Sequence, residues 1–163
     1  DAWLTPPALV TVLGLLGTAA SVSGNEAAIR FGRRRLVQTA LTLSIVFALL
    51  TGFVGSTSYT LATILLIAYG FVIWLDSSSL TAGTAGTAEP ERRGATLAVH
   101  SMLGYAGGFV GPLMVGLALD LSGGMSPINW GIAFSTVAVC MLIALIVFVR
   151  IRPDELAGDR GKA

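Results

Sequence analysis

The stretch WGIAFSTVAVCMLIALIVFV, residues 130–149, contains no charged side chain in 20 consecutive positions. About 20 apolar residues in a helix cross a hydrocarbon layer of about 30 Å. Four similar apolar blocks precede it, at residues 7–23, 36–54, 59–87 and 95–119. The sequence therefore predicts an all-α membrane protein with about five transmembrane helices and a tail at residues 150–163.

The composition of the whole chain agrees with this class. Apolar residues make up 54% of the chain and charged residues 12%, and the mean hydropathy is +0.80. An ordinary soluble domain carries about 25% charged residues. The net charge is only +1, and the basic residues stand beside apolar blocks. We therefore expect them to anchor helix ends in membrane lipid, and we expect no nucleic-acid partner.

The ten basic residues fall in alternate connecting segments of the chain. They follow the first, third and fifth apolar blocks, whereas residues 1–6, 55–58 and 120–129 contain none. Cytoplasmic segments of membrane proteins carry an excess of lysine and arginine. This pattern predicts an external N-terminus, a cytoplasmic C-terminal tail, and a location in the plasma membrane or the bacterial inner membrane.

The third block raises the question of where its helix ends. Residues 76–88 contain no proline, and an unstructured loop of that length is uncommon. We therefore expect one continuous helix over residues 59–87. The alternative is a helix that ends near Leu75 and leaves Asp76 at the membrane interface.

In the continuous helix, Asp76 lies inside the membrane. An ionised group at the centre of a membrane helix costs about 2.5–3.5 kcal/mol, and such groups usually face a wet cavity or a partner. Steps of three and four residues from Asp76 lead to Tyr69 and Ser79, a polar stripe suited to a cavity wall. We expect Asp76, Ser79 and Tyr69 to serve substrate contact or proton coupling.

His100 is the single histidine of the chain and stands about two turns into the fourth block. A titratable imidazole at this depth can relay protons or hold an anionic substrate, and it can equally be a packing residue bonded to a neighbour. The distance from His100 to Asp76 cannot be derived from the sequence.

The fourth block also carries small residues at regular spacing. Such residues let two helix backbones approach closely, and a proline removes one helical hydrogen bond. This face is interpreted as a packing surface or a hinge. Its members are Gly104, Gly108, Gly111, Pro112 and Gly116.

Motifs for catalysis or metal binding are absent from the sequence, which has no CxxC, HExxH, GxSxG or P-loop pattern. We predict no metal, no cofactor and no enzymatic activity. An intramembrane enzyme would need Asp76 and His100 as its polar catalytic groups.

The segment between the first two blocks carries a loop pattern. It reads GNEAAIRFGRRR over residues 24–35, with Arg30, Gly32, Arg33 and Arg34 as its characteristic positions. It resembles the loop signature of the major facilitator superfamily, in which a glycine is followed by aspartate-arginine, one residue, a second glycine and two basic residues. Ile29 stands where that signature has its aspartate.

Further along, the pattern from Asp76 through residues 90–94 to the glycine-rich helix is similar to helices 10 and 11 of such transporters. The resemblance implies that the five spans are helices 8–12, within the C-terminal six-helix bundle. It implies a secondary transporter that moves a small solute by alternating access with a coupled proton or ion, together with the N-terminal half of the same protein. The loop residues would then help to set the conformation. The alternative is a small stand-alone membrane protein with an assembly or regulatory role.

Overall fold

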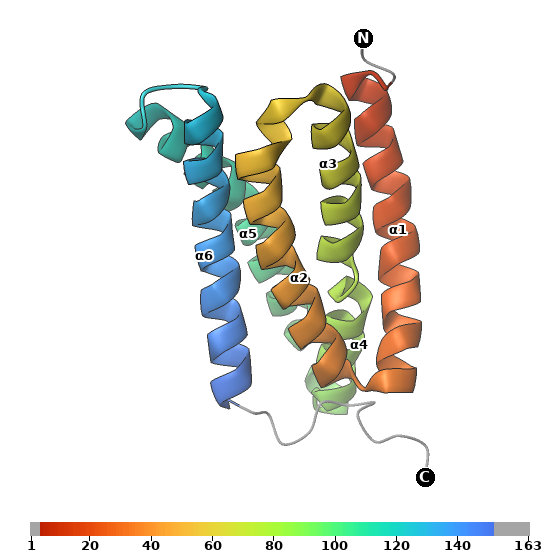
Figure 1. The fold of residues 1–163 in the computed structure, drawn as a ribbon. Coiled ribbons are helices and arrows are strands. Elements are labelled where there is room, and N and C mark those ends of the chain that lie inside the picture. The colour runs from red at the N-terminus through yellow and green to blue at the C-terminus, as the bar shows by residue number, and fades with distance from the viewer. Residues whose placement is uncertain (1–3, 152–163) are drawn as a thin grey trace.

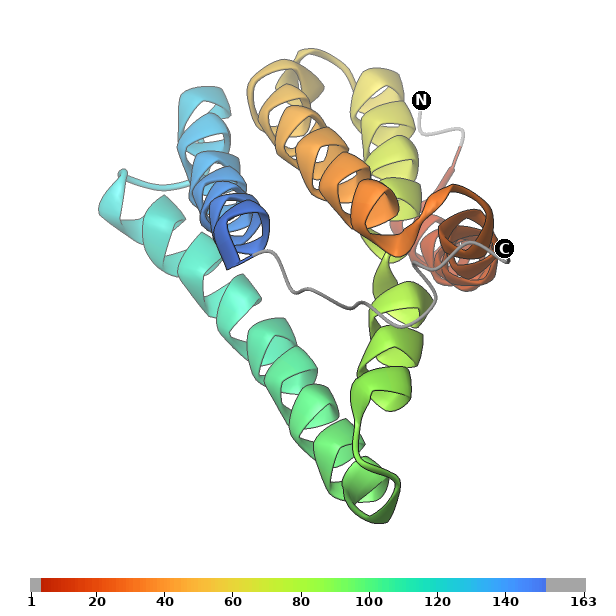
Figure 2. The ribbon, with the colours of Figure 1, turned by 90° about the horizontal axis from the view of Figure 1, so that it is seen from below.

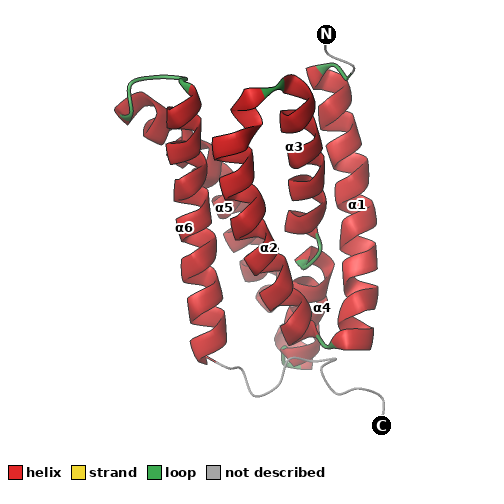
Figure 3. Cartoon of the chain, viewed as in Figure 1, coloured by secondary structure: helices red, strands yellow, loops and turns green. Residues whose placement is uncertain are grey.

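The structure is a computed structural model that describes residues 4–151. Within this range the chain forms helices and no strand (Figures 1 and 3). The α-helices are α1 (Pro6–Phe31), α2 (Arg33–Val54), α3 (Tyr59–Trp74), α4 (Ser77–Thr87), α5 (Arg93–Leu121) and α6 (Pro127–Ile151). Two short 3-10 turns, η1 (Gly55–Thr57) and η2 (Pro90–Arg92), join them. Because α3 and α4 follow one another in a single pass, the described residues make five segments long and apolar enough to cross a membrane, which confirms the predicted class.

The helices are arranged around α2. It packs against α6 on one side and against α1 and α3 on the other (Figure 1). Seen from below, α5 runs obliquely from α6 to α4 (Figure 2), and it contacts those two helices. Many large apolar side chains point outward, including Leu103 and Phe109, each 70% exposed. The buried positions hold mostly small residues, as is usual where helices pack in lipid.

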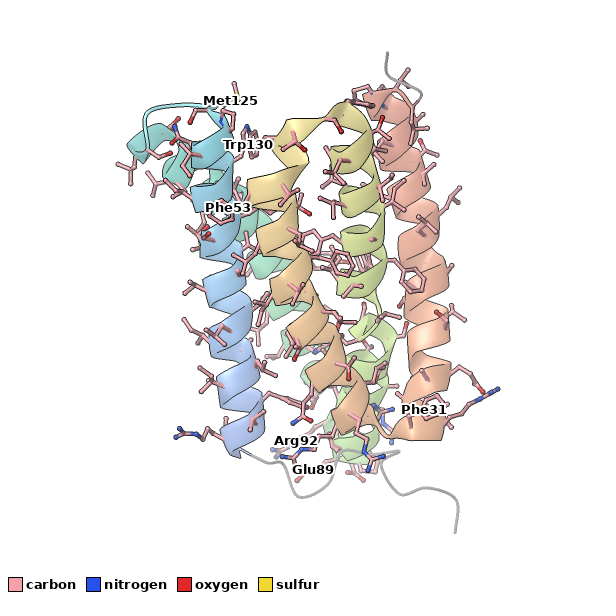
Figure 4. All side chains as sticks on the ribbon, in the orientation of Figure 1. Phe31, Phe53, Glu89, Arg92, Met125 and Trp130 are labelled. Carbon is pink, nitrogen blue, oxygen red and sulfur yellow. The ribbon has the colours of Figure 1, made fainter. Side chains whose placement is uncertain are left out.

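The two ends of the bundle differ in charge. Figure 4 places Phe31, Glu89 and Arg92 at one end, and Met125 and Trp130 at the other. Arg92 lies 3.6 Å from Glu89 in an exposed ion pair. Helices α1, α4 and α6 end at the charged end, and α2 and α5 begin there (Figure 1).

The segment expected as a loop at residues 24–35 is almost entirely helical. Helix α1 continues to Phe31, and α2 begins at Arg33. Glu26 and Arg30 form an ion pair of 2.8 Å one turn apart, which favours the helix. Gly32 alone makes the turn, with φ of 92°, a conformation that glycine adopts without steric cost.

The expectation of one continuous helix over residues 59–87 is wrong at one point. Helix α3 ends at Trp74, Leu75 and Asp76 form a turn, and α4 resumes at Ser77 (Figure 3). The Leu75 N–H donates to the Val72 carbonyl at 3.2 Å, which is a tighter turn than an α-helix makes. The reason is tertiary. Helix α1 approaches so closely at Gly24 that a Cβ added there would overlap the Leu75 carbonyl group.

Candidate functional site

Asp76 lies at the break between α3 and α4, where it directly precedes the first residue of α4. With about 1.5 Å per residue, it stands about 25 Å along the Tyr59–Thr87 span from Tyr59. Its surroundings form a pocket of about 300 Å³. The lining residues come from three helices and the break: Ile73, Trp74, Asp76, Ser77, Leu80 and His100.

His100 of α5 therefore shares one pocket with Asp76, a proximity that the sequence could not establish. Two threonines of α4 hold the imidazole. Thr81 Oγ1 lies 3.1 Å from Nε2, and Thr84 Oγ1 lies 3.5 Å from Nδ1. Since Thr81 and Thr84 are three residues apart, they stand on one face of α4 and meet the ring from both of its nitrogens.

These threonines also donate to backbone carbonyls, Thr81 to Ser77 at 3.1 Å and Thr84 to Leu80 at 2.9 Å. A hydroxyl has one proton and can accept as well as donate. When its proton goes to the backbone, its oxygen accepts a ring N–H, and when the hydroxyl rotates, it donates to an unprotonated ring nitrogen. Each threonine can therefore hydrogen-bond its ring nitrogen as acceptor or as donor, whichever tautomer His100 adopts.

Trp74 is a wall of this pocket that the sequence reasoning missed. It is 47% exposed and also lines a second pocket of about 330 Å³ between α1 and the α3–α4 segment. The second pocket carries the hydroxyl residues Thr18, Ser21 and Ser78, and Ser21 hydrogen-bonds to Ser78 across the two helices. A tryptophan two positions before an intramembrane aspartate was a signal that could have drawn attention to it.

Ser79 and Tyr69 do not reach the Asp76 pocket. Ser79 has no exposed surface and accepts a hydrogen bond of 3.1 Å from Nε of Arg33. Tyr69 packs edge-on against Phe134 of α6, with ring centroids 6.4 Å apart. The polar stripe expected from steps of three and four therefore does not form one cavity wall, because Ser79 faces Arg33 of α2 and Tyr69 faces α6.

The loop pattern lies at the start of α2. Arg33 is only 4% exposed, and its side chain crosses α4 at Gly83, where an added Cβ would stand 3.1 Å from Arg33 Cδ. Arg30 is exposed and pairs with Glu26, and Arg34 is half-buried. Among these residues Arg33 is the one that ties the α1–α2 turn to α4, the half-helix that begins beside Asp76.

The small-residue face of α5 has a different environment. A Cβ added at any of its glycines would meet no described atom within 4 Å, and Pro112 is exposed within the helix. The glycines concerned are Gly104, Gly107, Gly108, Gly111 and Gly116. The face expected to pack is therefore uncovered within residues 4–151.

The five apolar spans define a multispan membrane protein, with a polar pocket at the break in its third span. The sequence profile described as Major Facilitator Superfamily matches residues 4–163, nearly the whole chain. The chain therefore belongs to the major facilitator superfamily, a family of transporters rather than enzymes. Comparison with curated proteins and with solved structures gives no match.

Proposed function

We propose that this chain is the C-terminal part, helices 8–12, of a secondary transporter that moves a small solute by alternating access with a coupled proton or ion. The observation that carries the proposal is the pocket that Asp76 and His100 share at the break in an apolar span. Discontinuous membrane helices commonly build solute and ion sites in secondary transporters, because their ends expose polar backbone groups. The third span is such a discontinuous helix, because α3 ends at Trp74 and α4 begins at Ser77.

Asp76 is the proton or solute contact in this proposal, and His100 is the second polar contact. A carboxylate in hydrocarbon is stabilised by a proton or a cation, so its occupancy changes with the site's access to water. Helix α5 brings His100 to the same pocket, and Thr81 and Thr84 hydrogen-bond its ring nitrogens. Ser79 and Tyr69 do not line this pocket; Ser79 instead accepts a hydrogen bond from Arg33, and Tyr69 packs against Phe134.

Arg33 links this site to the cytoplasmic side of the proposed topology. Its bond to Ser79 fixes α4 relative to the α1–α2 turn, while the break at Leu75–Asp76 separates α4 from α3. Movement of α4 would require the Arg33–Ser79 contact to change. We place the N-terminus outside and the tail inside, in the plasma membrane or the bacterial inner membrane, because the arginines of α2 and η2 gather at one end.

The N-terminal half of the same transporter is the partner in this proposal. The uncovered glycines of α5 offer a surface to which a second helix backbone can approach closely. A site between two halves also agrees with a solute pocket that is open on one side here.

The test is uptake by the complete transporter in proteoliposomes with an imposed pH gradient. We expect Asp76→Asn to abolish gradient-driven uptake, because the amide cannot release a proton. Asp120→Asn is the matched control, since Asp120 is an exposed carboxylate at the opposite end of the bundle. Unchanged uptake and unchanged pH dependence in Asp76→Asn would remove Asp76 from the mechanism.

A further inference from the structure

Trp74 lies beside the proposed solute site and lines two pockets. These are the Asp76 pocket and the hydroxyl-lined pocket against α1. Nearly half of the residue is exposed. A large aromatic surface is therefore presented to two cavities, one of which contains a carboxylate.

Gly17 of α1 positions this ring. A Cβ added at Gly17 would lie 2.9 Å from Cδ1 of Trp74 and 3.0 Å from Nε1. The five-membered ring of the indole thus rests against the α1 backbone, in space that no other residue type leaves free. Gly17 itself is buried. One edge of the ring is held by α1, and the rest of the side chain forms a wall of each pocket.

The charges near Trp74 favour one class of solute. Asp76 stands two positions away and His100 lines the same pocket, whereas the second pocket contributes hydroxyl and apolar groups. Indole is the best aromatic partner for a cation, and the contact strengthens when water is excluded. A carboxylate inside the membrane adds an ionic partner. An anion would meet the same carboxylate at close range.

We infer that Trp74 and Asp76 together select a solute with a cationic head and an apolar or aromatic body, and that Gly17 sets the position of the indole. The inference rests on the proposed transport function, of which it names the solute class. The cationic head lies between the indole face and the carboxylate. The body lies in the rest of the same pocket, beside Ile73 and Leu80.

Equilibrium binding to the complete transporter, without any gradient, tests this inference. The probes are tetraphenylphosphonium and tetraphenylborate, which have the same shape and opposite charges, with detergent micelles alone as the blank. We expect tetraphenylphosphonium to bind and tetraphenylborate to bind at least tenfold more weakly. Equal binding of the two ions would overturn the assignment of solute class.

Variants of the ring and its support test the residues. We expect Trp74→Ala to weaken tetraphenylphosphonium binding about 30-fold, the factor that a desolvated cation–π contact supplies, and Trp74→Phe to weaken it about threefold. Gly17→Ala should displace the indole and weaken binding several-fold. Gly14→Ala is the matched control, because Gly14 lines the same pocket and has open space at its Cβ.

Each variant is compared at equal amounts of monodisperse protein, so that loss of folding is not mistaken for loss of binding. Binding that is unchanged in Trp74→Ala would overturn the role of Trp74. Equal effects of Gly17→Ala and Gly14→Ala would overturn the role of Gly17. Gradient-driven uptake of a neutral solute without tetraphenylphosphonium binding would overturn this inference and leave the transport proposal in place. Binding of tetraphenylphosphonium without any gradient-driven uptake would overturn the transport proposal and leave this assignment of solute class in place.

Discussion

Helices α1 and α5 each carry a line of small residues, but the two lines have different surroundings. On α1, Gly17 and Gly24 are buried and lie against Trp74 and Leu75. On α5, the glycine line meets no described atom within 4 Å. The sequence pattern is more regular on α5, yet the close packing within residues 4–151 occurs on α1. Small residues at helical spacing thus show that a backbone can approach, but they do not show which one does.

The glycine line of α5 is nevertheless near other helices, because Gly107 and Gly111 line a pocket with Thr136 and Cys140 of α6. His100 stands one turn before Gly104, and it is held by Thr81 and Thr84 of α4. The N-terminal part of α5 lies near α4, and its C-terminal part lies near α6 (Figure 2). The contrast between the two helices can be tested by changing one position at a time.

The largest effect is expected at Gly24. In Gly24→Ala the new Cβ overlaps the backbone carbonyl of Leu75, which cannot move aside as a side-chain tip could. We expect a destabilisation of about 3 kcal/mol or failure to fold. Thermal melting of the complete transporter measures it. Gly116→Ala is the control, and an equal drop in melting temperature for both variants would contradict the contrast between α1 and α5.

The next effect is expected on α5 itself. Gly108→Leu places a large side chain on the face that we assign to the N-terminal half, so it should reduce uptake by the complete transporter 10- to 100-fold. The packing of residues 4–151 offers no clash at this position. Val99→Leu, at an exposed position of the same helix, is the control. Normal uptake by Gly108→Leu would show that no helix packs closely on this line.

A smaller effect is expected at the Arg33–Ser79 contact. Ser79→Ala leaves the buried Nε of Arg33 without this acceptor, which should cost about 1–3 kcal/mol of stability and change the balance of inward- and outward-facing states. Melting and accessibility of a cytoplasmic-side cysteine label measure the two effects. Ser77→Ala is the comparison, because Ser77 lies two residues earlier on α4 and lines the Asp76 pocket. A Ser79→Ala transporter that melts and labels like the wild type would exclude a role for this bond.

The smallest effect is expected at the threonines that hold His100. Thr81→Val removes the hydroxyl that lies 3.1 Å from Nε2, and we expect a three- to tenfold loss of gradient-driven uptake. Thr81→Ser keeps the hydroxyl and should restore most of the activity. If Thr81→Ser is as impaired as Thr81→Val, the methyl group rather than the hydrogen bond is what matters at this position.

Several features of the molecule could be predicted from the sequence because they depend on composition and local order. The five spans follow from uncharged runs near the length of a membrane helix, and the transporter family follows from the loop pattern around Gly32. Asp76 was singled out because a carboxylate within an apolar run is costly wherever the helix lies. These inferences need no knowledge of neighbouring helices.

Other features needed contacts between segments far apart in the chain. The break at Leu75 and Asp76, the shared pocket of Asp76 and His100, and the burial of Ser79 under Arg33 all depend on where α1, α2 and α5 lie. Helical spacing from Asp76 leads to Ile73 and Leu80, which do line its pocket. Ser79 and Tyr69 instead contact α2 and α6, because the position of each neighbouring helix decides which face it meets.

The sequence by itself therefore determined the membrane class, the number of spans, the family and the residue whose charge is most costly in lipid. Only the tertiary structure decided which side chains share a pocket with that residue and which glycines contact another helix. It also showed that Trp74 lines two pockets. The physical reason is that transfer into lipid depends on each segment's own side chains, whereas a site depends on the close approach of backbones. That approach is set here by Gly17 and Gly24 of α1.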